Sequence, residues 1–238
     1  MKGVFPLISI EGFQVAFKYF QLFKEGLVCT VTLSFLTVVF GFVLALVLAL
    51  MRLSNIKPLK FIASAYVEVF RATPLMVQLF LVYYVLLADV SLPVFKLFGI
   101  IRFERMVPGV IALALNSGAY LSEIIRSGIQ SIDLGQTEAA RSLGMTPWQT
   151  MQYIILPQAI KNILPAIANE FVTIIKESSI CWTIGVQEIM SAVNSIKAAT
   201  YTCGEALIIA ACVYFCLTFP TSKVIEHFER KMSRGDKR

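Results

Sequence analysis

Apolar residues fill most of the chain and occur in long blocks that short polar segments separate. From Gly26 to Met51 there are 26 consecutive residues without a charge. At about 1.5 Å per residue, such a helix is longer than the roughly 30 Å hydrocarbon layer of a membrane. The pattern predicts an all-α integral membrane protein with five transmembrane helices, at about residues 27–51, 61–87, 106–127, 158–180 and 206–226.

The fourth block is the least apolar of the five, because it contains Lys161, Glu170 and Lys176. Charged groups at membrane depth are tolerated where they face other helices or a water-filled cavity. We therefore interpret residues 158–180 as a span that lines a pathway.

Residues 1–25 have a different pattern, in which Phe13, Phe17 and Phe20 recur at three- and four-residue spacing with charged residues elsewhere. This spacing predicts an amphipathic helix that lies in the membrane interface. Residues 26–230 then form the transmembrane domain, and residues 231–238 form a basic cytoplasmic tail.

Composition and charge agree with this organisation. Hydrophobic residues make up 57% of the chain and charged residues 15%, against about 25% charged residues in soluble domains, which excludes a water-soluble globule. The net charge is +6. In a membrane protein such a charge informs on topology, through the positions of Lys and Arg relative to the apolar blocks, and not on a nucleic-acid partner.

One short loop contains Arg52, Lys57 and Lys60 and no acidic residue, and such loops stay in the cytoplasm. The N-terminus is therefore expected outside and the C-terminus inside.

The chain lacks the residue patterns of an enzyme or a metalloprotein. Its five cysteines and its single histidine, His227, form no CxxC pair and no ligand cluster. The sequence contains no recognisable nucleophile and base, and no phosphate-binding loop of the Walker type. We expect no catalytic activity, no metal and no cofactor in this chain.

A polar loop at about residues 131–157 carries the clearest local signals. Gly144 fits the left-handed position that ends a helix. Thr146, Pro147 and Gln149 fit a capping box with proline at the first position of the next helix. The loop is therefore expected to fold as two short helices that meet at a glycine, the second ending before Pro157.

These two helices would form a knob on the cytoplasmic face, with apolar side chains ringed by charge. Such a surface suits docking into a groove of a partner protein. The alternative is a loop that only connects two spans and lies on the lipid headgroups. The residues expected at the surface of the knob are Leu143, Met145, Trp148, Glu138 and Arg141.

The same loop resembles the EAA motif of ABC importer permeases, which docks on the nucleotide-binding subunit. The resemblance extends to stretches of the permeases for polar amino acids, at Arg71–Phe80, Gly118–Gln130 and Asn169–Ser179. Departures from the usual residues are few: Ala72, Ser122 and the segment Lys176-Glu177-Ser178. The residues that match the EAA motif are Glu138, Ala139, Ala140, Gly144, Ile154, Leu156 and Pro157.

The resemblance implies a permease subunit of the type I fold in the bacterial cytoplasmic membrane, which translocates polar amino acids. Its expected partners are two cytosolic ATPase subunits that bind ATP and Mg²⁺, an extracytoplasmic solute-binding protein, and a second permease that is either identical or related. The residues implied in coupling to the ATPase are Glu138, Ala139, Ala140, Gly144, Met145 and Trp148.

Polar residues inside the spans are candidates for the substrate pathway, because an amino acid needs partners for both its ammonium and its carboxylate. We expect Glu170 to face the ammonium, and Lys176, Asn116 or Gln78 to face the carboxylate or a side-chain amide. Buried Asn and Gln can also simply bond across helices. Glu68 and Arg71 are spaced as a structural pair in the second span.

A second function stays open at this point. The chain could be a secondary transporter or channel that works alone and uses its intramembrane charges as ion relays. Five spans without a visible inverted repeat favour the importer subunit.

Overall fold

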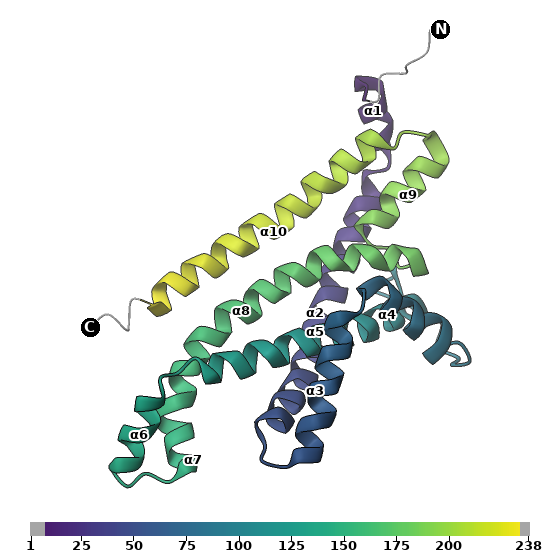
Figure 1. Cartoon of the computed structure of the whole chain (residues 1–238). Coiled ribbons are helices and arrows are strands. Elements are labelled where there is room, and N and C mark those ends of the chain that lie inside the picture. Colours follow the sequence, from purple (N-terminus) through teal and green to yellow (C-terminus); the bar gives the residue numbers. More distant parts are fainter. Residues whose placement is uncertain (1–7, 234–238) are drawn as a thin grey trace, which may run out of the picture. The chain divides into compact units, whose positions relative to one another are not determined.

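The computed structural model describes residues 8–233 and is built almost entirely of helices (Figure 1). One short hairpin pairs β1 (Lys96–Leu97) with β2 (Ile101–Arg102) in antiparallel register. Three of the helical segments are π or 3-10 turns that adjoin α-helices: η1 (Val82–Leu86), η2 (Met151–Ile155) and η3 (Ser178–Ile184). The α-helices are α1 (Ile10–Lys18), α2 (Phe20–Leu53), α3 (Lys57–Ala72), α4 (Leu75–Leu81), α5 (Phe103–Gln130), α6 (Leu134–Ser142), α7 (Pro147–Thr150), α8 (Leu156–Glu177), α9 (Ile189–Thr200) and α10 (Gly204–Ser233).

Within residues 8–233, three helices are long and apolar enough to cross a membrane: α2, α5 and α10 as far as Lys231. A fourth crossing is obtained if α3 and the α4–η1 segment together form one span. The all-α membrane fold is therefore confirmed. Helix α8 covers most of the predicted fourth span, but it does not belong to this apolar group.

The span predicted at residues 61–87 contains a helix break between Ala72 and Leu75. Thr73 has an extended backbone, with φ −109° and ψ 144°. The ring of Pro74 clashes with a helical conformation of the residue before it, which pushes that residue into the extended region. The Thr-Pro pair thus divides the predicted span into α3 and α4–η1.

The N-terminal region contains a helix break, but at Tyr19 and not near residue 25. Ser9 caps α1 by accepting a hydrogen bond from the backbone N–H of Gly12 at 2.9 Å. Tyr19 ends α1, and α2 then runs from Phe20 to Leu53 without interruption. The first seven residues of the predicted interfacial helix, and residues 234–238 of the predicted basic tail, lie outside the described part of the chain.

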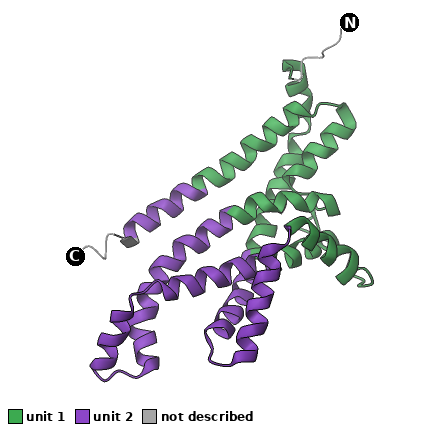
Figure 2. Ribbon diagram, viewed as in Figure 1, with its two compact units in different colours: residues 1–37, 75–113, 173–220 green, residues 38–74, 114–172, 221–238 purple. Residues whose placement is uncertain are grey.

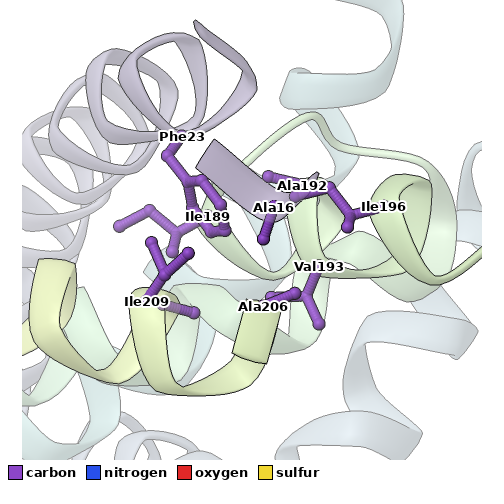
Figure 3. Packing of buried hydrophobic residues seen from close by; sticks show 9 residues of the cluster. Ala16, Phe23, Ile189, Ala192, Val193, Ile196, Ala206 and Ile209 are labelled. Carbon is purple, nitrogen blue, oxygen red and sulfur yellow. The ribbon is translucent and has the colours of Figure 1, made fainter. Parts of the chain in front are cut away.

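Contacts divide the chain into two compact units, and α2, α5, α8 and α10 each contribute residues to both (Figure 2). The core of the first unit is an apolar cluster drawn from α1, α2, α9 and α10 (Figure 3). Phe23 and Ile189 are almost fully buried at its centre. A Cβ on Gly26 would lie 2.9 Å from the backbone of Glu188 and Ile189, so glycine is required for α2 to approach this segment so closely.

The core of the second unit joins α2, α3, α5 and α8. Leu48, Val67 and Ala119 pack together, and the Tyr66 hydroxyl donates a hydrogen bond to the Leu115 carbonyl at 2.9 Å. Small residues permit the close approach of helices in membranes.

One such small residue is Gly118. A Cβ there would lie 2.8 Å from Leu44. The presence of glycine at the first position of the Gly118–Gln130 segment is thus explained by the packing of α5 against Leu44.

Candidate functional site

The first helix of the polar loop, α6, ends in a Schellman motif at Gly144. This glycine has φ +84°. Its N–H donates to the carbonyl of Arg141 at 3.0 Å, and the N–H of Met145 donates to the carbonyl of Ala140 at 3.2 Å. This pair of bonds is the one that defines the motif. The predicted glycine stop is confirmed.

The second helix begins as the sequence predicts. The Thr146 hydroxyl accepts a hydrogen bond from the Gln149 N–H at 3.3 Å, and the Gln149 side-chain oxygen accepts one from the Thr146 N–H at 2.8 Å. Pro147 occupies the first helical position, where no backbone donor is needed. The capping box is therefore confirmed.

The predicted end of this helix before Pro157 is wrong, because α7, η2 and α8 form one continuous helical segment. Leu156 has helical angles, φ −62° and ψ −43°. A proline inside a helix lacks one N–H and clashes with the carbonyl four residues earlier. Here the preceding turn, η2, is a π-helix, which is wider and accommodates the ring.

Exposure separates the six predicted coupling residues into two groups. Glu138, Ala139, Gly144 and Trp148 are exposed, with 73% of Trp148 accessible. Met145 is half-buried and Ala140 is buried. Ala140 therefore packs inside the knob and contributes to its shape instead of its surface. A further exposed side chain, Leu143, stands beside them and is 84% accessible.

The knob is fixed to the helices that flank it by polar contacts within the second unit. The Asn162 side-chain amide donates to the Ser131 hydroxyl at 3.1 Å, and the Gln158 amide donates to Gln136 at 3.5 Å. Arg141 donates to the carbonyl of Met145 across the glycine turn. These bonds connect α6, and the residue that directly follows α5, to α8.

The predicted pair of Glu68 and Arg71 does not form an ion pair in the described structure. Both side chains are exposed, and the Arg71 guanidinium lies over the ring of Tyr120, 5.5 Å from its centroid. Cation–π attraction of this kind stabilises an arginine without a carboxylate. Spacing of three residues permits a pair, but the ring on α5 offers Arg71 a different partner.

A half-buried charge cluster that the sequence reasoning missed joins α2 to α5. Glu123 accepts hydrogen bonds from Arg52 at 2.6 Å and from Arg126, which also donates to Gln130. The side chains of Arg52 and Glu123 are only 13% and 23% exposed. A signal was available for half of this cluster, since Glu123 and Arg126 have helical i, i+3 spacing. Arg52 lies 71 residues away from Glu123 in sequence.

The four predicted pathway residues are divided between the units. Gln78 and Lys176 lie in the first unit, and Asn116 and Glu170 lie in the second. Gln78 and Asn116 are buried, Glu170 is half-buried and Lys176 is exposed. Lys176 lines a cavity of about 810 Å³ in the first unit, together with Glu177, Thr173, Ser179, Trp182 and Tyr214.

Residues 37–234 match the family described as "Binding-protein-dependent transport system inner membrane component". The chain belongs to this family. It is thus a multi-pass inner-membrane component of a transport system, as the resemblance implied.

Relatives of this permease family agree over nearly the whole chain. The arginine transport system permease protein ArtQ of Bacillus subtilis is 42% identical over 89% of this chain and 93% of its own length. A putative glutamine transport system permease protein GlnP of Rickettsia typhi is 38% identical over 87% and 91%. The L-cystine transport system permease protein TcyB of Bacillus subtilis is 36% identical over 91% and 88%.

Solved structures give the same result for the permease fold. A crystal structure of an amino acid ABC transporter with histidines contains a chain that is 45% identical, with a TM-score of 0.85 over 94% of this chain and 100% of that one. A structure of the MetNI methionine ABC transporter is 18% identical, with a TM-score of 0.64 over 87% and 96%, and so shares the fold.

Glu188 is a second residue of this permease that sequence reasoning missed. Its side chain is fully buried and caps α9 by accepting from the N–H groups of Met190 at 2.8 Å and Ser191 at 2.9 Å. The Tyr214 hydroxyl of α10 donates to the same carboxylate at 2.7 Å. Burial raises the pKa of Glu188 to about 7, although these three donors act in the opposite direction. The sequence signal for this capping role was the position of Glu188 directly before an apolar helix.

Proposed function

We propose that this chain is the transmembrane permease subunit of an ATP-binding cassette importer for polar amino acids. The observation that carries this proposal is its similarity over nearly the full length to permeases named for arginine, glutamine and cystine transport. The subunit itself carries no catalytic function and needs no cofactor, and ATP with Mg²⁺ is bound by its partner.

The knob formed by α6 and α7 is the proposed contact with the ATPase, as the EAA resemblance implies. Exposed Leu143 and Trp148 supply apolar anchors, and exposed Glu138 supplies a charge at their edge. Large side chains that are this exposed on a polar loop are typical of a docking surface. Two ATPase subunits, a second permease and an extracytoplasmic solute-binding protein complete the proposed assembly.

The proposed topology has five spans with the N-terminus outside. Three are α2, α5 and α10, the fourth is the broken segment α3 with α4–η1, and the fifth is α8. Helix α8 carries charges that a span facing only lipid would exclude, so we assign it to the translocation pathway.

Transport by the purified permease in liposomes tests this function. We expect uptake of a polar amino acid, with arginine, glutamine and cystine as the first probes, only when the ATPase, ATP and the solute-binding protein are present. Flux through the permease alone, driven by an ion gradient, would instead identify a stand-alone transporter.

The proposed substrate pathway uses Gln78, Asn116, Glu170 and Lys176. A zwitterion requires an acid and a cation, and the cavity beside Lys176 has both in its lining, together with hydroxyl groups. The lining also includes Trp182 and Tyr214, whose rings can contact an apolar part of the substrate.

Two separate variants, Glu170→Gln and Asn116→Leu, test this pathway. Each is expected to raise the substrate concentration for half-maximal uptake by about tenfold, because each removes one hydrogen bond to the substrate that is charged or buried. Glu11→Gln and Asn194→Leu are matched controls, because Glu11 is an exposed acid and the Asn194 amide donates only to the Met190 carbonyl of its own helix. Both controls should behave as wild type. Unchanged uptake in both test variants would place specificity entirely in the external binding protein.

A further inference from the structure

An apolar groove of about 520 Å³ lies in the first unit, and one of its lining residues, Ile209, also belongs to the cluster shown in Figure 3. One wall is formed by α1 and the start of α2, with Phe13, Phe17 and Phe20. The other wall is formed by α10, with Cys212, Val213 and Cys216. Its volume is within the range of about 300–1,000 Å³ that ligand sites have.

The lining of the groove has no charged group and no hydrogen-bonding group stronger than a thiol. Phe17 is 57% exposed, and both Cys212 and Cys216 are exposed. Because α2 and α10 are both candidate membrane spans, this open apolar surface is suited to a hydrocarbon chain. A water-soluble ligand would find no polar partner there.

One lysine, Lys24, stands next to the groove and gives its occupant a charge preference. Lys24 lies four residues after Phe20 on the same helical face, and its Nζ is 5.6 Å from the centroid of the Phe20 ring. Lys24 forms no ion pair with any residue between 8 and 233. The neighbouring Glu25 accepts instead from the Gln21 amide at 3.1 Å.

We infer that this groove binds one acyl chain of an anionic phospholipid, with its phosphate on Lys24. An apolar slot beside an ammonium group that forms no ion pair is complementary to a hydrocarbon tail joined to a negative headgroup. A zwitterionic phospholipid also carries a phosphate, but it brings a cation next to Lys24. This binding is independent of the substrate that the permease carries.

The native cysteines report occupancy of the groove in the purified transporter complex. The complex in detergent is mixed with phosphatidylglycerol or with phosphatidylcholine of the same chains, and alkylation by N-ethylmaleimide is followed by peptide mass spectrometry. We expect phosphatidylglycerol to slow alkylation of Cys212 and Cys216 about fivefold more than phosphatidylcholine does, as expected for about 1 kcal/mol per lysine. Cys203, which does not line the groove, is the internal reference.

Lys24→Gln should remove the difference between the two lipids. Lys60→Gln, which removes another exposed lysine, on α3, should keep it. Equal protection by both lipids in wild type would mean unspecific hydrocarbon contact and would overturn the proposal. The proposal would also be overturned if Cys212 and Cys216 were protected from alkylation without added lipid and neither lipid changed their rate. A protein partner such as the second permease would then cover the groove.

Discussion

Gly144→Val is expected to reduce ATP-driven uptake at least about tenfold while the protein stays folded in the membrane. Gly144 has φ +84°, and a Cβ at this position would meet nothing within 4 Å. The cost of a side chain is therefore backbone strain alone, roughly 1–2 kcal/mol for an ordinary residue and more for a β-branched one. Relief of this strain opens the Schellman motif and turns α7 away from α6. The exposed side chains Leu143 and Trp148 then no longer share one docking surface.

Two variants separate this effect from a general loss of stability. Gly144→Asn should retain most of the uptake, because asparagine accepts the left-handed conformation at low cost. Gly99→Val creates the same strain at φ +74° in open space, but in the β1–β2 hairpin. It should leave binding of the ATPase unchanged. Pull-down of the ATPase and uptake by liposomes are the measurements, and wild-type values in both for Gly144→Val would contradict the docking role.

Features of the fold that depend on neighbouring residues could be predicted from the sequence. The glycine stop at Gly144 and the capping box of Thr146 and Gln149 are satisfied by bonds within six residues. The apolar blocks that become α2, α5 and α10 are equally visible, because length and hydropathy are local quantities.

Features that depend on competition or on distant partners could not be predicted. Pro74 and Pro157 are both visible in the sequence, yet Pro74 divides a helix while Pro157 lies inside one, because a π turn accommodates its ring. Arg71 had an acidic neighbour at the right spacing and contacts an aromatic ring instead. Pairing of Arg52 with Glu123 is set by the packing of α2 on α5, which no local pattern contains.

Glu123→Ala is expected to destabilise the permease by about 2–3 kcal/mol, more than any other single replacement considered for its charged residues. The change leaves the guanidinium groups of Arg52 and Arg126 facing each other without the carboxylate between them. Breaking a fully buried pair costs about 3–5 kcal/mol, and the partial exposure of these side chains lowers that value. The measurement is the thermal unfolding midpoint of the purified protein in detergent. Arg52→Ala should cost less, because Glu123 then keeps Arg126.

The matched control is Glu226→Ala in α10. Glu226 also lies between two cations on helical spacing, Lys223 at 2.9 Å and Arg230 at 3.4 Å. Its side chain is 42% exposed, however, and exposed pairs of this kind contribute little to stability because solvent screens them. A double-mutant cycle of Arg52→Ala and Glu123→Ala then measures the coupling between α2 and α5. A coupling energy near zero, or equal shifts of the unfolding midpoint for Glu123→Ala and Glu226→Ala, would contradict a stabilising role of the charges. The two helices would then be held together by apolar packing alone, in which Ala45 and Ala49 of α2 contact Leu121 and Ile125 of α5.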